Sequence, residues 1–279
     1  MGKIHDALQK AEQMRRGASA APDVANAPIE VAAPRAPQPP PQPKPSWRAR
    51  LQLRRGAARP RGGPLSIGES TLSEEYRTLR ARIQSLRRTR ELRSIVITST
   101  RPSEGKTTTS ANLALSFGLE REGATCLVDA DLRTPRLHKV FGGASPVGLA
   151  EVLEGDAKLD EALIAVPDTR LMVLPVRAMP TAPSELLASR AMSELVAELH
   201  TRFHTVIFDA PPVLGLPDTV TLVDLCDGAL FVVGAGSAPR DEVESALERL
   251  DASKVLGVVL NRCDSSEVPY ASAYGTGSR

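Results

Sequence analysis

Hydrophobic residues in the second half of the chain form short continuous runs separated by amphipathic stretches. Six runs have the length and composition of buried strands: Ser94–Thr98, Thr125–Asp129, Leu171–Leu174, Thr205–Asp209, Ala229–Val233 and Val255–Leu260. Helical patterns separate them, including a charged helix over residues 71–89 and a helix from Thr107 to about Glu122. Apolar strands that alternate with helices predict an α/β fold, with a mostly parallel central sheet and helices on both faces.

The first 64 residues have a different pattern. Residues 1–16 place their apolar side chains on one face of an amphipathic helix, which either packs on its own domain or meets a partner or membrane surface. Residues 17–64 are rich in Pro, Ala and Arg, so we expect a disordered linker; its arginines are either simply solvated or attract anionic lipid or a partner. The folded domain is then expected over 65–264, followed by a flexible tail over 265–279.

The composition argues against nucleic-acid binding, a membrane span and a cysteine metal site. The chain has 279 residues, a formal net charge of +2 and 3% aromatic residues, so a nucleic-acid partner is not expected. No apolar run approaches the ~20 residues of a membrane span, and the N-terminus shows no apolar signal region, which favours a cytoplasmic protein. The three cysteines, Cys126, Cys226 and Cys263, show no metal-binding spacing and are expected to be reduced thiols.

A phosphate-binding loop follows the first predicted strand. The segment reads TSTRPSEGKTTT and leads into a helix, so its backbone N–H groups and the helix N-terminus can form an anion site. Lys106 can reach the β- and γ-phosphates of ATP, and the Thr107 hydroxyl can bind Mg²⁺. The residues expected to contact the nucleotide here are Arg101, Pro102, Ser103, Glu104, Gly105, Lys106, Thr107 and Thr108.

Aspartates end two other predicted strands. Asp129 and Asp131 lie in the segment LVDADLR, and Asp209 lies in VIFDAPP. Ligands of parallel sheets bind beyond the carboxyl ends of the strands, so these three carboxylates should converge near the phosphates, where they suit Mg²⁺. The alternative is that they only cap the helices that follow.

Together these motifs resemble the deviant-Walker P-loop ATPases, in which LVDADLR is the Walker A′ motif. Within that group the chain is similar to the bacterial protein-tyrosine kinases that regulate capsule and exopolysaccharide export. Further matches are DADLRTPRLHKVFG from Asp129, GLAEVLEG from Gly148, PSELL from Pro183 and GVVLN from Gly257. The resemblance covers roughly residues 70–274. Thr100 replaces the usual leading glycine of the loop, and Arg101 stands where partition ATPases carry a signature lysine.

The resemblance implies roles for the site residues. Asp209 would be the Walker B acid that orders the water shell of the metal, Asp129 the acceptor of the tyrosine proton, and Asp131 a group that orients metal or base. Spacing alone does not divide the roles of Asp129 and Asp131. Asn261 lies either on the adenine side of the site or only in a turn. Arg133 is expected to support the Walker A′ segment.

Two further segments fit a kinase that phosphorylates itself. Glu74, Arg77 and Arg80 lie along one side of a helix, either as a solvated face or as the E-x-x-R-x-x-R motif by which these kinases assemble into rings. Tyr270 and Tyr274 lie in the Gly/Ser-rich tail and are the expected phosphoacceptors, although the family tail is denser in tyrosine.

The resemblance also implies partners. A membrane polysaccharide co-polymerase would activate the protein through a cytoplasmic tail and hold it at the inner membrane, and a tyrosine phosphatase would oppose it. The alternatives are a non-kinase ATPase switch of the partition or cell-division type and a DNA-binding partition protein, which phosphotyrosine analysis and salt-dependent DNA retention would separate.

Overall fold

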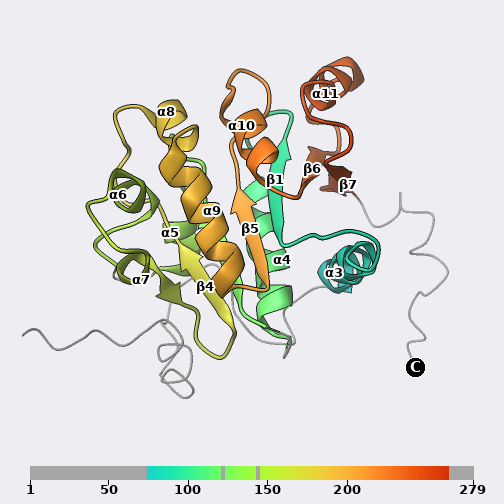
Figure 1. Ribbon diagram of the computed structural model, residues 1–279. Coiled ribbons are helices and arrows are strands. Elements are labelled where there is room, and N and C mark those ends of the chain that lie inside the picture. The colour runs from blue at the N-terminus through green and yellow to red at the C-terminus, as the bar shows by residue number, and fades with distance from the viewer. Residues whose placement is uncertain (1–73, 121–122, 143–144, 264–279) are drawn as a thin grey trace, which may run out of the picture. The chain divides into compact units, whose positions relative to one another are not determined.

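The computed structural model describes residues 74–120, 123–142 and 145–263 (Figure 1). Within them a seven-stranded sheet has the order β3-β4-β2-β5-β1-β6-β7. All neighbouring strands pair in parallel except β3, which pairs antiparallel with β4. The strands are β1 (Ser94–Ser99), β2 (Thr125–Asp129), β3 (Ile164–Ala165), β4 (Leu171–Leu174), β5 (Thr205–Asp209), β6 (Gly228–Gly234) and β7 (Val255–Asn261). The predicted α/β fold is confirmed, and only the two-residue β3 was not predicted.

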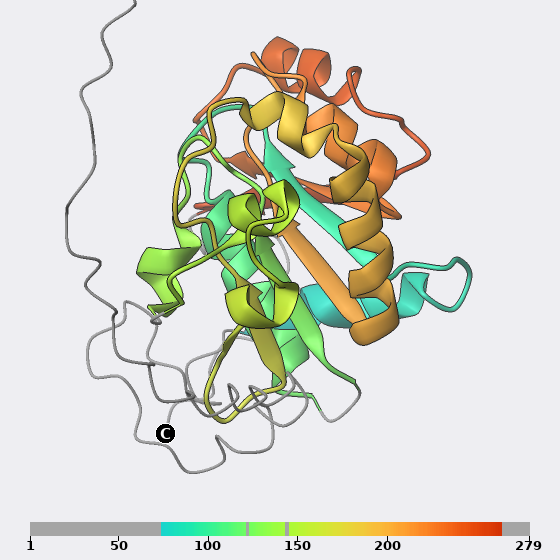
Figure 2. The ribbon, with the colours of Figure 1, turned by 60° about the vertical axis from the view of Figure 1, so that its left-hand side comes forward.

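Helices cover both faces of the sheet, because successive side chains of a buried strand point to opposite sides. Val96 of β1 belongs to a hydrophobic cluster that takes side chains from α6 (Leu149–Glu154), α7 (Leu159–Ala162), α8 (Pro183–Leu187), α9 (Arg190–Arg202), α10 (Asp218–Leu225) and α11 (Arg240–Leu247). Its neighbours Ile95 and Ile97 belong to a second cluster, with side chains from α3 (Glu74–Leu86), α4 (Lys106–Gly118) and α5 (Leu137–Phe141). Figure 2 shows the same sheet and its helices after a turn about the vertical axis.

Helix α4 ends four residues before the predicted end. The carbonyl of Gly118 accepts a hydrogen bond from the backbone N–H of Arg170, at 2.7 Å. A side chain on Gly118 would also lie 2.8 Å from Cβ of Leu171. Close packing against the start of β4 therefore terminates the helix, and this contact is invisible in the local pattern.

The N-terminal helix, the linker and the tail with Tyr270 and Tyr274 lie outside the described residues. Among the helices of residues 74–263 that are described, none is long and apolar enough to cross a bilayer. Cys126 and Cys226 are free thiols buried in the core, and Cys263 is free and partly exposed. Cys126 and Cys226 thus pack like small hydrophobic side chains, and their reduced state stays a prediction.

Candidate active site

The predicted loop and aspartates meet at the carboxyl ends of the central strands. Register pairs Asp129 of β2 with Asp209 of β5, and Asp209 with Ile97 of β1. The segment after β1 then turns into α4, whose first residue is Lys106. Parallel pairing brings these strand ends to one edge of the sheet, which is where parallel α/β folds bind ligands.

The loop is closed by a side chain of its own. Glu104 is fully buried, and its Oε2 accepts the backbone N–H of Arg101 at 2.7 Å. Among non-glycine residues in the described part of the chain, positive φ occurs at Ser103, Asp168 and Arg262, and not at Thr100. Thr100 therefore occupies ordinary backbone geometry, which explains why the loop needs no glycine there.

Gly105, in contrast, cannot be replaced easily. Its φ is +103°, and a Cβ would lie 1.9 Å from Nδ2 of Asn261. The same Asn261 amide donates to the carbonyl of Glu104 at 2.9 Å. Asn261 thus holds the loop backbone from the end of β7, a contact that neither sequence alternative included; its contact with adenine stays a prediction.

Lys106 is a buried cation among carboxylates. Its side chain is only 8% exposed. Burial lowers its pKa, and the charges of Asp209, Asp131 and Glu104 act in the opposite direction. The nearby carboxylates thus offset part of the effect of burial on the pKa of Lys106. A buried cation at the start of α4 is suited to bind phosphate oxygens.

Asp209 is held from the first turns of α4. It is 2% exposed, and its Oδ1 accepts a hydrogen bond from Ser110 Oγ at 3.0 Å. Burial raises its pKa to about 6, while side-chain hydrogen bonds from Thr107 and Ser110 and the charge of Lys106 lower it. Sequence reasoning missed Ser110, although its i+3 spacing from Thr107 places both hydroxyls on one side of the helix.

The two carboxylate oxygens of Asp129 have different surroundings: one caps a helix and the other has no partner among the described residues. Its Oδ2 accepts the backbone N–H groups of Arg136 and Leu137, at 3.1 and 2.9 Å, and so caps α5. Its Oδ1 is buried and has no hydrogen-bond partner. Burial, then the charge of Asp209, raises the pKa of Asp129 to about 8. One oxygen is structural and the other is left for a proton or a metal ion.

The rest of the Walker A′ segment is fixed by polar contacts. Asp131 accepts from the N–H and hydroxyl of Thr134, both at 2.9 Å. Arg133 donates to Oδ2 of buried Asp218 at 3.2 Å and to Oγ of Ser184 at 2.8 Å, which joins the segment to α10 and α8. The prediction that Arg133 supports this segment is confirmed.

The three charged residues of α3 do not form one exposed row. Arg77 pairs with Glu74 at 3.4 Å on the surface. Arg80 turns inward, donating to the carbonyl of Ser116 at 2.7 Å and pairing with Glu120 at 2.6 Å. Arg80 therefore docks α3 on the end of α4 within one chain.

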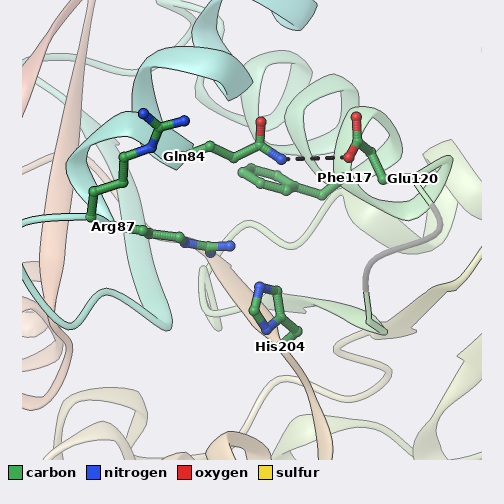
Figure 3. Close-up of a pocket in the computed structure, with 6 residues that line it drawn as sticks. Gln84, Arg87, Phe117, Glu120 and His204 are labelled. Carbon is green, nitrogen blue, oxygen red and sulfur yellow. Dashed lines mark hydrogen bonds between the residues drawn. The ribbon is translucent and has the colours of Figure 1, made fainter.

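A separate cavity of about 430 Å³ lies at the other edge of the sheet, lined by Gln84, Arg87, Arg88, Phe117, Glu120 and His204 (Figure 3). The guanidinium of Arg87 lies 5.0 Å from the centre of the Phe117 ring and donates to Thr205 Oγ1, at the start of β5. The cavity is thus at the amino ends of the strands and is distinct from the phosphate loop.

Comparison with known proteins decides the family. No protein-family model matches the chain. The chain is 37% identical over 210 residues to the tyrosine-protein kinase YwqD of Bacillus subtilis, an alignment that spans 75% of this chain and 88% of YwqD. The chain belongs to the bacterial tyrosine kinases. As a bacterial tyrosine kinase it also resembles the solved kinase domain of Escherichia coli tyrosine kinase ETK, with a TM-score of 0.64 and 26% identity over 77% of this chain and 88% of that domain.

This bacterial tyrosine kinase is also similar to a polysaccharide transport protein and to a septum site-determining protein. It is 34% identical to the succinoglycan biosynthesis transport protein ExoP of Rhizobium meliloti over 71% of its own length, but only 26% of ExoP. It also matches the septum site-determining protein MinD of Pyrococcus horikoshii, solved with Mg-ADP, with a TM-score of 0.52 and 25% identity over 65% of this chain and 76% of MinD.

The raised pKa of Asp129 predicts a pH-dependent stability in nucleotide-free, chelator-treated protein. Between its ordinary value of 3.8 and about 8, the folded state holds a proton that the unfolded state has lost, so stability falls as pH rises through this range. Asp129→Asn removes the titration and keeps an oxygen to cap α5. We expect its gain in Tm over wild type to be at least a few degrees larger at pH 9 than at pH 5, measured by calorimetry.

The control for this measurement is Asp131→Asn, which alters a partly exposed carboxylate in the same segment. An Asp129→Asn gain in Tm that is the same at both pH values would show that Asp129 does not carry the titration.

Proposed function

We propose that this tyrosine kinase transfers the γ-phosphoryl group of ATP to Tyr270 and Tyr274 of a neighbouring copy, as part of a system that makes or exports an extracellular polysaccharide. The observation that carries the proposal is the meeting of Lys106, Asp209 and Asp129 at one edge of the sheet, beside the start of α4, where no side-chain cap hydrogen bond is made. Membership of the tyrosine kinase family supports the reaction.

The residues present fit ATP and Mg²⁺. The oxygens of Thr107, Asp209 and Asp131, with the unpartnered Oδ1 of Asp129, are hard ligands of the kind that Mg²⁺ prefers. Bound Mg²⁺ would neutralise charge on the β- and γ-phosphates. Lys106 would bind the same phosphate oxygens, and the loop residues from Arg101 to Thr108 would surround them.

Asp129 is the proposed acceptor of the tyrosine proton. A tyrosine hydroxyl has a pKa near ~10, so a base of ordinary aspartate strength would be poorly matched to it. In the metal-free site burial raises the pKa of Asp129 to about 8, closer to that of the tyrosine hydroxyl, so its ionised form is a stronger base than an ordinary aspartate. Asp131 would then orient the metal or this base.

The proposed neighbour is another copy in a ring, and the proposed membrane partner is a polysaccharide co-polymerase with a cytoplasmic tail. The similarity to ExoP, a succinoglycan transport protein, supports that setting. A tyrosine phosphatase would reverse the modification, and nucleic acid is not a proposed partner. Arg101 makes two hydrogen bonds to Glu242, at 2.5 and 2.7 Å, so reaching a neighbour's phosphate would require breaking this pair.

The test is mass spectrometry of purified protein incubated with ATP and Mg²⁺. Phosphotyrosine at positions 270 and 274 supports the proposal, and mixing an inactive with a tail-deleted active protein tests transfer between copies. ATP hydrolysis with no phosphotyrosine would instead identify an ATPase switch, the second candidate favoured by the similarity to MinD.

The inward position of Arg80 changes how the ring is tested. Arg80→Ala loses charge-assisted hydrogen bonds between α3 and α4, so we expect a loss of about 2 kcal/mol in stability, or roughly 4–8 °C in Tm. Arg77→Ala, on the exposed side, should keep Tm while weakening assembly and autophosphorylation. Thermal melts and light scattering measure both.

Arg82→Ala is the matched control, because Arg82 is an exposed arginine of the same helix. If Arg77→Ala assembles and autophosphorylates like wild type, the exposed pair with Glu74 is only a solvated face.

A further inference from the structure

The carboxylate of Glu104 connects two segments that are far apart in the sequence. Besides the N–H of Arg101, it accepts from the backbone N–H of Gly234 at 3.3 Å and from the hydroxyl of Ser237 at 2.5 Å, both through Oε1. Gly234 ends β6, and Ser237 lies in the connection that leads to α11. A single buried carboxylate thus binds the start of the phosphate loop and the β6–α11 connection.

No described lysine or arginine neutralises this carboxylate by an ion pair within 4 Å. The carboxylate is instead held by three hydrogen bonds, and the positive charge of Lys106 lies nearby. The hydrogen bond from Arg101 to Glu104 has a consequence for ligand binding. Because the Arg101 N–H donates to Glu104, it is not available to a phosphate. Pro102 has no N–H, so phosphate binding is left to the N–H groups from Ser103 onwards.

The backbone of Glu104 is held as well. Its carbonyl accepts from the Asn261 amide at 2.9 Å, and the carbonyl of Asn261 accepts from the N–H of Ala235 at 2.8 Å. Both ends of Glu104 are therefore fixed to the adjacent ends of β6 and β7, immediately before Gly105 and Lys106. A shift at this residue would move the N–H groups that face the phosphates.

We propose that Glu104 is a positioning residue for the nucleotide, which acts by fixing the phosphate loop to Ser237 and Gly234. The inference rests on the proposed nucleotide site and not on the identity of the phosphorylated tyrosine. It predicts that Ser237, which is not part of the loop, controls nucleotide affinity through Glu104.

The test measures Mg·ADP binding by calorimetry, together with KM for ATP and kcat for autophosphorylation. Glu104→Gln has one acceptor oxygen where the carboxylate has two, so it cannot serve Arg101 and Ser237 equally. We expect its Mg·ADP affinity to fall about tenfold, the equivalent of one charge-assisted hydrogen bond. Ser237→Ala should weaken affinity severalfold, and Ser237→Thr, which keeps the hydroxyl, should restore it. KM should rise more than kcat falls.

Two comparisons make the result decisive. The double variant Glu104→Gln/Ser237→Ala should lose less affinity than the two single losses combined, because both remove the same contact. Glu244→Gln, an exposed carboxylate of α11 paired with Arg240, is the matched control and should bind Mg·ADP normally.

The proposal is overturned if Ser237→Ala lowers Tm but leaves Mg·ADP affinity and KM unchanged, since the contact would then only support the fold. Wild-type protein that binds Mg·ADP but forms no phosphotyrosine on the tail would refute the proposed acceptors and leave the role of Glu104 standing. Wild-type protein that fails to bind Mg·ADP would refute the nucleotide site itself.

Discussion

Lys106→Met is expected to reduce the rate of autophosphorylation by at least about 10²–10³-fold while the protein stays folded. The lysine would supply a positive charge to the expected phosphates, and methionine fills similar space without charge. A second effect adds to the first, because Lys106 lowers the pKa of Asp209 and its removal leaves that carboxylate more readily protonated. Radiolabelled ATP and thermal melts measure rate and folding.

Lys139→Met is the matched control, because Lys139 is exposed on α5 and should tolerate the change. A folded Lys106→Met protein that transfers phosphate at the wild-type rate would contradict the assignment of the loop. Because Lys106 is buried, the stability of the Lys106→Met variant needs its own measurement.

The double substitution Tyr270→Phe/Tyr274→Phe should remove most of the phosphate incorporated by the protein and leave Mg·ADP binding and assembly unchanged. Phenylalanine lacks the hydroxyl that accepts the phosphoryl group but keeps the ring. Tyr76, the third tyrosine, lies partly buried on α3 and should contribute little. Intact-mass spectrometry after incubation with ATP counts the phosphates on each variant.

Tyr76→Phe alone is the control and should incorporate phosphate as wild type does. If the double variant incorporates as much phosphotyrosine as wild type, the tail is not the acceptor. If neither wild type nor the double variant incorporates phosphate while both hydrolyse ATP, the ATPase-switch function is favoured.

Much of the site could be predicted from sequence because it follows from topology. Parallel strands place their carboxyl ends at one edge, so the sequence alone predicts that Lys106, Asp129 and Asp209 lie together. The same reasoning does not reach Ser237, because its contact with Glu104 joins residues 133 positions apart in the chain. The contact of Ser110 with Asp209 is more predictable, because Ser110 lies one helical turn after Thr107.

Helical spacing in the sequence also does not predict which charged side chains of α3 face solvent and which face α4. The spacing of Glu74, Arg77 and Arg80 places all three along one side of α3, yet Arg80 points into the contact with α4 and the other two pair at the surface. A side of a helix is wide enough to include both solvent and a neighbour, and long arginine side chains reach either. Only the packing partner, here Ser116 and Glu120, decides between them.

The distribution of the thiols makes the natural chain suitable for labelling at one position. Cys126 and Cys226 are sealed in the core, where burial raises the pKa of the Cys226 thiol to about 12 and keeps it in its unreactive form. Cys263 is partly exposed and lies two residues beyond Asn261, whose amide holds the proposed phosphate loop. A fluorophore or spin label attached there would report on nucleotide binding without any engineered cysteine.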